Sequence, residues 1–198
     1  MQFFLDIDGV LLNFEKSFAR WLNEGYGFRL PETYETTSWN YDDLLPREHI
    51  KEAWQRYLES DHSATMDPLV DLTRFNALAG SHDVHLVTNF PLQHADKREQ
   101  NLAQHGFTYS SLNFCGLRGF GGLKPRTKSE VIAQLRRSGE HALFVDDHPD
   151  NCLDVLENCG DTEVWVMTRL FNRDFAHPDI RRAQDWECVF NRIGQLME

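Results

Sequence analysis

The sequence lacks the features that mark membrane, secreted and zinc-binding proteins. No run approaches the roughly 20 consecutive apolar residues of a membrane-spanning helix. Met1 leads at once into a strand-like run containing Asp6, so a signal peptide is not expected either. The four cysteines form no CxxC pair, which favours reduced thiols in an intracellular chain. The predicted localisation is cytoplasmic.

Positive charge is also scarce in this sequence. Lys and Arg number 20 against 31 Asp and Glu, which gives a formal net charge of −11. Such a chain repels polyanions, so no nucleic acid polymer and no anionic membrane is expected as a partner. The expected partner is a small molecule. The oligomeric state cannot be read from the sequence.

Apolar runs and helical segments alternate along the 198 residues. Runs typical of buried strands lie at residues 2–7, 84–88, 112–115, 142–145 and 164–167. Helical segments are predicted at residues 93–105, 127–137, 151–158 and 185–197, and an irregular stretch at 173–183. The alternation predicts an α/β fold with a parallel sheet of about five strands flanked by helices.

The interval between the first two strands is too long for one crossover helix. It spans about 75 residues, where a single crossover needs far fewer. Residues 68–78, followed by Gly80, are predicted to form that helix. We therefore expect a core of residues 1–12 and 68–198, with residues 13–67 inserted after the first strand as a small helical cap.

Carboxylates follow two of the predicted strands. Asp6 and Asp8 end the first strand, and Asp146 and Asp147 end the fourth. Ligands of open parallel sheets bind at these strand ends. Carboxylates that meet there repel one another and retain protons unless a cation lies between them, and oxygen ligands favour Mg²⁺ over zinc. An acid/base pair and a solvated turn are the alternatives for Asp6 and Asp8.

Phosphate-binding groups follow the second and third strands. Thr88 and Asn89 offer a hydroxyl and an amide where an apolar run stops. Lys124 and Lys128, with Arg126 between them, offer positive charge that would neutralise a phosphate and hold an aspartate ionised. Ordinary turn chemistry and a solvated loop explain these residues if they are taken singly.

In their order along the chain, these residues resemble the haloacid dehalogenase (HAD) superfamily of phosphohydrolases. The matching motifs are DxDG at Asp6, Asp8 and Gly9; a strand-terminal threonine at Thr88; a lysine at Lys128 or Lys124; and an acidic strand end at Asp146 and Asp147. The resemblance implies a Rossmann-like HAD fold and Mg²⁺-dependent hydrolysis of phosphate monoesters. Lys128 is favoured because one helix and a short turn separate it from the acidic strand end.

The resemblance also implies a role for each motif residue. Asp6 would accept the phosphoryl group as an aspartyl-phosphate, and Asp8 would act as general acid and then as general base. Mg²⁺ would be held by Asp6, the Asp8 backbone carbonyl and Asp147, with Asp146 beside it or bound through water. Thr88 and the lysine would bind the phosphate oxygens.

Within the superfamily, the sequence is most similar to the 5'(3')-deoxyribonucleotidases and their bacterial relatives. Segments 6–11, 145–150, 171–172 and 185–186 carry this likeness. It implies a (deoxy)nucleoside monophosphate as the substrate, although Asn89 replaces the serine of the animal enzymes. Trp39 and Tyr41, in a polar stretch of the cap, are the best candidates to stack on a base. Most other cap aromatics are expected in its core.

Other functions remain open at this point. The same catalytic residues would serve a phosphatase for another small metabolite, such as a sugar phosphate. They would also serve a phosphotransferase, because both reactions proceed through the aspartyl-phosphate. A catalytically silent binding module is the alternative from a different class, and the complete motif set argues against it.

Overall fold

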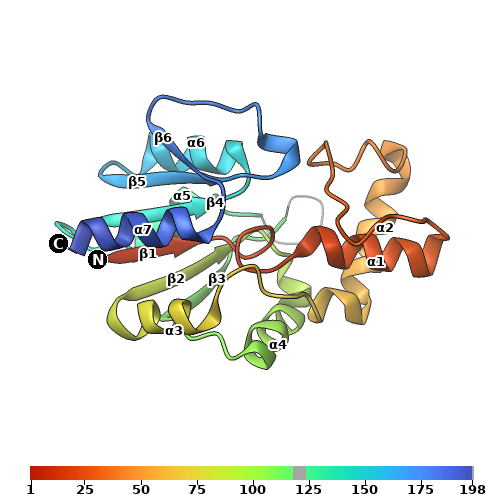
Figure 1. The fold of residues 1–198 in the computed structure, drawn as a ribbon, viewed down its shortest axis with the longest axis horizontal. Helices are drawn as coiled ribbons and strands as arrows, with labels where there is room; N and C mark the ends of the chain where they lie inside the picture. The colour runs from red at the N-terminus through yellow and green to blue at the C-terminus, as the bar shows by residue number, and fades with distance from the viewer. Residues whose placement is uncertain (118–123, 198) are drawn as a thin grey trace.

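The sheet contains six strands, all parallel, in the order β3-β2-β1-β4-β5-β6 (Figure 1). The structure is a computed structural model and describes residues 1–117 and 124–197. The strands are β1 (Gln2–Leu5), β2 (Asp83–Thr88), β3 (Ser111–Phe114), β4 (Ala142–Asp146), β5 (Thr162–Met167) and β6 (Ile180–Ala183). The predicted α/β fold with a parallel sheet is therefore confirmed.

Helices cover both faces of this sheet. The α-helices are α1 (Phe14–Tyr26), α2 (Arg47–Glu59), α3 (Leu72–Ser81), α4 (Ala95–His105), α5 (Lys128–Leu135), α6 (Pro149–Asn158) and α7 (Trp186–Met197). Three short 3₁₀ helices lie in the connecting segments: η1 (Asp61–Ala64), η2 (Leu92–His94) and η3 (Leu170–Asn172). No helix in the described part of the chain is long and apolar enough to cross a membrane.

Alternation along β1 divides the core in two. Phe3 and Leu5 pack into one cluster with residues of α3 and α7, while Phe4 packs into the other with residues of α5 and α6. Successive side chains of a strand point to opposite faces, and both faces of this strand are covered. That is why β1 reads as a continuous apolar run instead of an alternating pattern.

The sixth strand corrects the predicted count of about five and the predicted irregular tail. Residues 180–183 pair in parallel with β5 at the edge of the sheet. Two of the four positions are Arg181 and Arg182, of which Arg181 is exposed. Charged side chains are common on edge strands, where they discourage pairing with another chain. Because of these two arginines, residues 180–183 lack the run of apolar residues from which a buried strand is predicted.

The crossover helix lies later than predicted. α3 begins at Leu72, because the Asp71 carboxylate accepts hydrogen bonds from the backbone N–H groups of Thr73 and Arg74. It continues through Gly80 to Ser81, so Gly80 does not end it. Glycine at this site keeps an ordinary helical conformation, and a glycine alone is not sufficient to end a helix.

Residues 13–67 lie beyond the carboxyl ends of the strands. α1 and α2 pack side by side at the end of the molecule opposite the chain termini (Figure 1). Phe18, Trp21 and Tyr57 form the aromatic centre of this segment, with ring centroids 5.2 to 5.8 Å apart. These rings lie above the edge of the sheet to which the carboxylates were assigned, and they belong to the same buried cluster as Phe3 and Leu5 of β1.

Glu163 fastens the last helix to the sheet. From β5 it accepts hydrogen bonds from the Arg192 guanidinium of α7, at 2.8 Å, and from the Trp165 indole N–H, also at 2.8 Å. Arg181 of β6 approaches within 3.1 Å. Burial alone raises the pKa of this carboxyl, but the donors from Arg192 and Trp165 and the charge of Arg181 outweigh it, so the pKa is lowered.

We predict that Glu163→Gln reduces the free energy of unfolding by about 1 kcal/mol at pH 7, a value already discounted for solvent screening. The pKa of Glu163 is lower in the folded protein than its value of about 4.3 in the unfolded chain, so the ionised carboxylate stabilises the fold fully at pH values above about 4.3. This stabilisation is lost as the pH falls through the folded-state pKa. Urea unfolding across a pH series measures it. Exposed Glu157→Gln is the control and leaves the curve nearly unchanged. A deficit that persists unaltered into acid would contradict the ionic explanation.

Candidate active site

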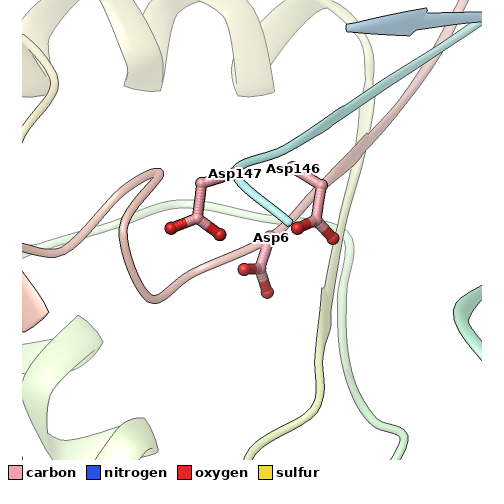
Figure 2. Close-up of side chains that lie close together, drawn as sticks. All are labelled: Asp6, Asp146 and Asp147. Atoms are coloured by element: carbon pink, nitrogen blue, oxygen red, sulfur yellow. The ribbon is translucent and has the colours of Figure 1, made fainter. Parts of the chain in front are cut away.

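Asp6, Asp146 and Asp147 meet where two central strands end. Asp6 directly follows β1, and its backbone N–H donates to the Val145 carbonyl of β4 at 2.9 Å. This parallel pairing brings the ends of β1 and β4 together. One carboxylate oxygen from each aspartate lies within 4.8 Å of the others, and all three residues are buried (Figure 2).

Lys128 contacts two of these carboxylates. It is the first residue of α5, whose N-cap is Thr127. Its Nζ lies 2.6 Å from an oxygen of Asp6 and 2.6 Å from an oxygen of Asp146. Burial alone lowers the pKa of the ammonium group, but Asp146 and Asp6 outweigh it and raise the pKa, so the lysine stays charged. Lys124, the other candidate, is exposed and is not among the described residues that line the pocket.

Asp146 and Asp147 differ in their hydrogen bonds. Besides Lys128, Asp146 accepts from the His148 backbone N–H at 2.8 Å and from the Asn151 side chain at 3.1 Å. Oδ1 of Asp147 is buried and has no hydrogen-bond partner in the described part of the chain. Asp147 therefore has an oxygen available for a ligand, whereas Asp146 is occupied in holding its neighbours.

Asp8 is paired with a buried arginine that the sequence did not single out. Arg98 of α4 is fully buried, and its Nη2 lies 2.8 Å from Oδ1 of Asp8. The guanidinium lies 4.2 Å from the centre of the Phe90 ring and donates to the Ser63 carbonyl at 3.2 Å. One arginine in a polar helix carries no sequence signal, so only the fold could identify this pair.

The residues fit a divalent cation. Burial raises the pKa of Asp6 to about 7, with Lys128 opposing and Asp146 and Asp8 adding to the shift. Burial, Asp146 and Asp6 also raise the pKa of Asp147 well above its ordinary value. When ionised, Asp6, Asp8, Asp146 and Asp147 carry four negative charges, and the two cations that contact them directly, Lys128 and Arg98, carry two positive charges. Among these residues, two negative charges therefore remain. A divalent cation would balance them, and oxygen ligands would suit Mg²⁺.

Gly9 leaves the space that Asp147 occupies. Its backbone has φ 77°, and a Cβ at this position would lie 2.0 Å from Oδ2 of Asp147. The loop around this contact is fixed by Arg169, which donates to the Gly9 carbonyl, and by the Asn172 amide, which donates to the Asp147 carbonyl at 2.6 Å. Two physical constraints thus favour glycine at this position of the DxDG motif: the positive φ of the backbone and the close approach of the Asp147 carboxylate.

Thr88 and Asn89 lie at the same edge of the sheet, at the end of β2. Thr88 is almost fully buried, and its hydroxyl oxygen accepts from the Phe90 backbone N–H at 3.1 Å. Its hydroxyl proton can still be donated. The Asn89 amide donates to the Asn151 side chain at 3.3 Å. Both residues line a pocket whose floor includes Asp6, Asp147 and Lys128.

The other walls of this pocket are mainly aromatic. Trp39 and Tyr41 line it, as do Gly9, Phe14, Glu15, Thr36, Trp54, Phe90, Pro91, Leu117, Asn151 and Phe171. Trp39 meets His148 and Phe171 edge to face, with centroid distances of 4.3 and 5.4 Å. Tyr41 is only 4% exposed and also packs against Phe18. The sequence did not separate Phe14 and Trp54 from the core rings, because helical spacing looks the same for both.

Solved structures share this fold. A HAD-superfamily hydrolase of subfamily IA from Geobacter sulfurreducens is similar over 98% of this chain and 96% of that chain, with TM-score 0.64 and 16% identity. CbbY from Rhodobacter sphaeroides, solved in complex with phosphate, is similar over 93% and 94%, with TM-score 0.58 and 16% identity. The HAD-hydrolase YfnB from Bacillus subtilis, solved bound to magnesium, is similar over 98% of both chains, with TM-score 0.58 and 16% identity.

No protein-family model matches the sequence, and no curated protein does. At 16% identity the likeness to the solved structures concerns the fold. The chain has the Rossmann-like HAD fold.

We predict that Gly9→Ala displaces Asp147 and destabilises the protein by about 1 to 3 kcal/mol, because the new methyl group overlaps a carboxylate and the backbone has a positive φ. Thermal unfolding measures the loss. Gly80→Ala is the matched control: a Cβ there meets nothing within 4 Å, so helix propensity makes it neutral or stabilising by up to about 1 kcal/mol. Equal unfolding temperatures for the two variants would contradict the steric account.

Proposed function

We propose that this chain is a Mg²⁺-dependent phosphomonoesterase that acts through an aspartyl-phosphate on Asp6, with nucleoside monophosphates as substrates. The observation that carries the proposal is the grouping of Asp6, Lys128 and Asp147 on the floor of one pocket, with the Asp6 and Lys128 side chains 2.6 Å apart. The HAD fold supports it, since solved relatives of that fold include a hydrolase bound to magnesium and a protein in complex with phosphate.

Asp6 is the nucleophile in the first step. Its carboxylate oxygen attacks phosphorus in line, the bond from phosphorus to the ester oxygen breaks, and the phosphoryl group is left on Asp6. Lys128 holds Asp6 ionised and meets the negative oxygens of the incoming phosphate. Asp8 gives its proton to the leaving alkoxide. Burial raises the pKa of Asp8 despite the opposing charge of Arg98, which supports a protonated resting state.

Asp8 reverses its role in the second step. As a carboxylate it takes a proton from water, whose oxygen attacks phosphorus and breaks the bond to Asp6. Inorganic phosphate and the free Asp6 carboxylate result, and Asp8 is again protonated. Thr88 and Asn89 donate hydrogen bonds to phosphate oxygens in both steps.

The residues proposed to hold Mg²⁺ are Asp6, Asp147 and the backbone carbonyl of Asp8. The unpartnered oxygen of Asp147 supports this assignment. Asp146, already bonded to Lys128 and Asn151, would keep these ligands in position or bind through water. When bound at these residues, Mg²⁺ would neutralise the charge that repels an anionic substrate from a carboxylate nucleophile.

The substrate proposal rests on the aromatic walls. Residues 13–67 would act as a cap over a catalytic core of residues 1–12 and 68–198, and they contribute Trp39, Tyr41 and Trp54 to the pocket. Planar bases stack on such rings, with a contribution of about 1 to 3 kcal/mol for each base. A nucleoside monophosphate matches both a charged floor and an aromatic wall.

We expect Asp6→Asn to retain the fold and to lose turnover by about 10⁴-fold or more, since removal of a nucleophile eliminates the covalent route. Phosphate release from a chromogenic ester, with Mg²⁺ or with EDTA, measures it. The wild-type protein should require Mg²⁺. Near-normal turnover by a folded Asp6→Asn protein would rule out the assignment.

The two lysines provide a matched pair for the same assay. Lys128→Ala removes the buried partner of Asp6 and Asp146 and should lower phosphate release by about 10²-fold or more. Lys124→Ala, in the exposed loop, should behave as the wild type. The opposite ranking would transfer the phosphate-binding role to Lys124.

A substrate panel tests the nucleotide proposal separately. We expect ribo- and deoxyribonucleoside monophosphates to be hydrolysed with a higher kcat/KM than sugar phosphates, because stacking adds about tenfold or more to binding. Trp39→Ala should reduce this preference, whereas exposed Tyr26→Ala, outside the pocket, should not. If only sugar phosphates were hydrolysed, the proposed phosphatase chemistry would stand and the proposed nucleotide substrate would be wrong.

A further inference from the structure

Glu15 is a carboxylate of the pocket that the proposed chemistry does not use. It lies in the first turn of α1, beside Phe14, and both side chains line the pocket. Its side chain is only 8% exposed. Because glutamate is rarely buried without a partner, its position needs a reason.

No described group satisfies this carboxylate fully. Oε1 is buried and has no hydrogen-bond partner in the described part of the chain. Thr36 shares the same wall, but its hydroxyl is engaged with Asp43 at 2.8 Å and with the Ser38 carbonyl at 2.7 Å. Burial raises the pKa of Glu15 to about 7 and the charge of Glu35 adds to it, while Arg169 and a hydrogen bond from the Thr36 backbone N–H oppose it. A buried acceptor without a donor is destabilising, so this oxygen is suited to a ligand.

The surroundings of Glu15 restrict what the ligand can be. Phe14, Tyr41 and Trp54 share the pocket with it, so much of the wall on that side is aromatic, with the Thr36 backbone N–H beside the carboxylate. A sugar ring carries hydroxyls on every side, and those that face the aromatic rings would be buried without partners, which is costly. A flat ring with apolar faces and one polar edge avoids that cost, and its edge can meet the single carboxylate.

We propose that Glu15 is a specificity-determining residue that accepts a hydrogen bond from a ring N–H on the base of a nucleotide substrate. This rests on the proposed function. In its ionised form, which predominates above its pKa of about 7, the carboxylate only accepts, so it selects bases that present a donor on their outer edge. Uracil and guanine rings, with their N3–H and N1–H groups, are of this kind.

The first test needs no variant of Glu15. Uridine 5'-monophosphate and its N3-methyl analogue are titrated into the wild-type protein in EDTA, with tryptophan fluorescence as the readout. Trp39 and Trp54 in the pocket wall provide the signal. We expect the N-methylated nucleotide to bind about 10 to 100 times more weakly, the range for hydrogen bonds to charged groups. Guanosine 5'-monophosphate and its N1-methyl analogue form a second pair.

Glu15→Gln then assigns the discrimination to this side chain. The change preserves shape and leaves an amide oxygen that can still accept, but the hydrogen bond is no longer to a charged group, so the penalty of methylation should fall several-fold below that of the wild type. Glu24→Gln, on the exposed side of the same helix, is the matched control and should retain the full penalty. If Glu15 has only a structural role, both nucleotides weaken alike in Glu15→Gln and the ratio stays that of the wild type, which overturns the proposal.

The binding readout separates this inference from the proposed function. Discrimination in EDTA with no Mg²⁺-dependent phosphate release would support Glu15 and refute the enzyme. Phosphate release with equal binding of parent and methylated nucleotides would support the enzyme and refute the role of Glu15. Absence of nucleotide binding would also refute that role.

Discussion

The repulsion among the carboxylates at the ends of β1 and β4 is the constraint on which the rest of the site depends. Two unit charges 4.8 Å apart, the outer limit for Asp6, Asp146 and Asp147, repel by about 3.5 kcal/mol at an effective dielectric constant of 20. The sheet must hold them together against this force. Parallel pairing of β1 with β4 does so through the backbone, and Lys128 does so by bridging Asp6 and Asp146.

The edge of the sheet supports this arrangement from a distance. Arg182 of β6 donates to the Asn172 side-chain oxygen at 3.2 Å and to its backbone carbonyl at 3.0 Å. Asn172 in turn donates to the Asp147 carbonyl. A chain of hydrogen bonds thus joins the sixth strand to the acidic loop. β6, which the sequence did not predict, thus helps to position Asp147, which the sequence did predict. Such outer hydrogen-bond partners orient the groups that bind a ligand.

Sequence patterns predicted those parts of the molecule that depend on local order. Five strands, the later helices and the acidic strand ends each follow from a run of apolar residues and the residues after it. Arg98 and Glu15 could not be predicted in this way, because their meaning depends on which groups the fold brings near them. The choice between Lys124 and Lys128 is of the same kind, since only the fold shows that Lys128 is buried and Lys124 is exposed.

The two ends of the pocket are built by different means, and this explains how one fold can host several substrates. The floor derives from strand ends whose positions are set by sheet pairing, whereas the aromatic wall derives largely from residues 13–67. Side chains of the wall can change without disturbing the floor, which is how function varies on a common fold. Arg98 limits that freedom. It pairs with Asp8 and donates to the Ser63 carbonyl, so a shift of the inserted segment also alters the surroundings of a floor carboxylate.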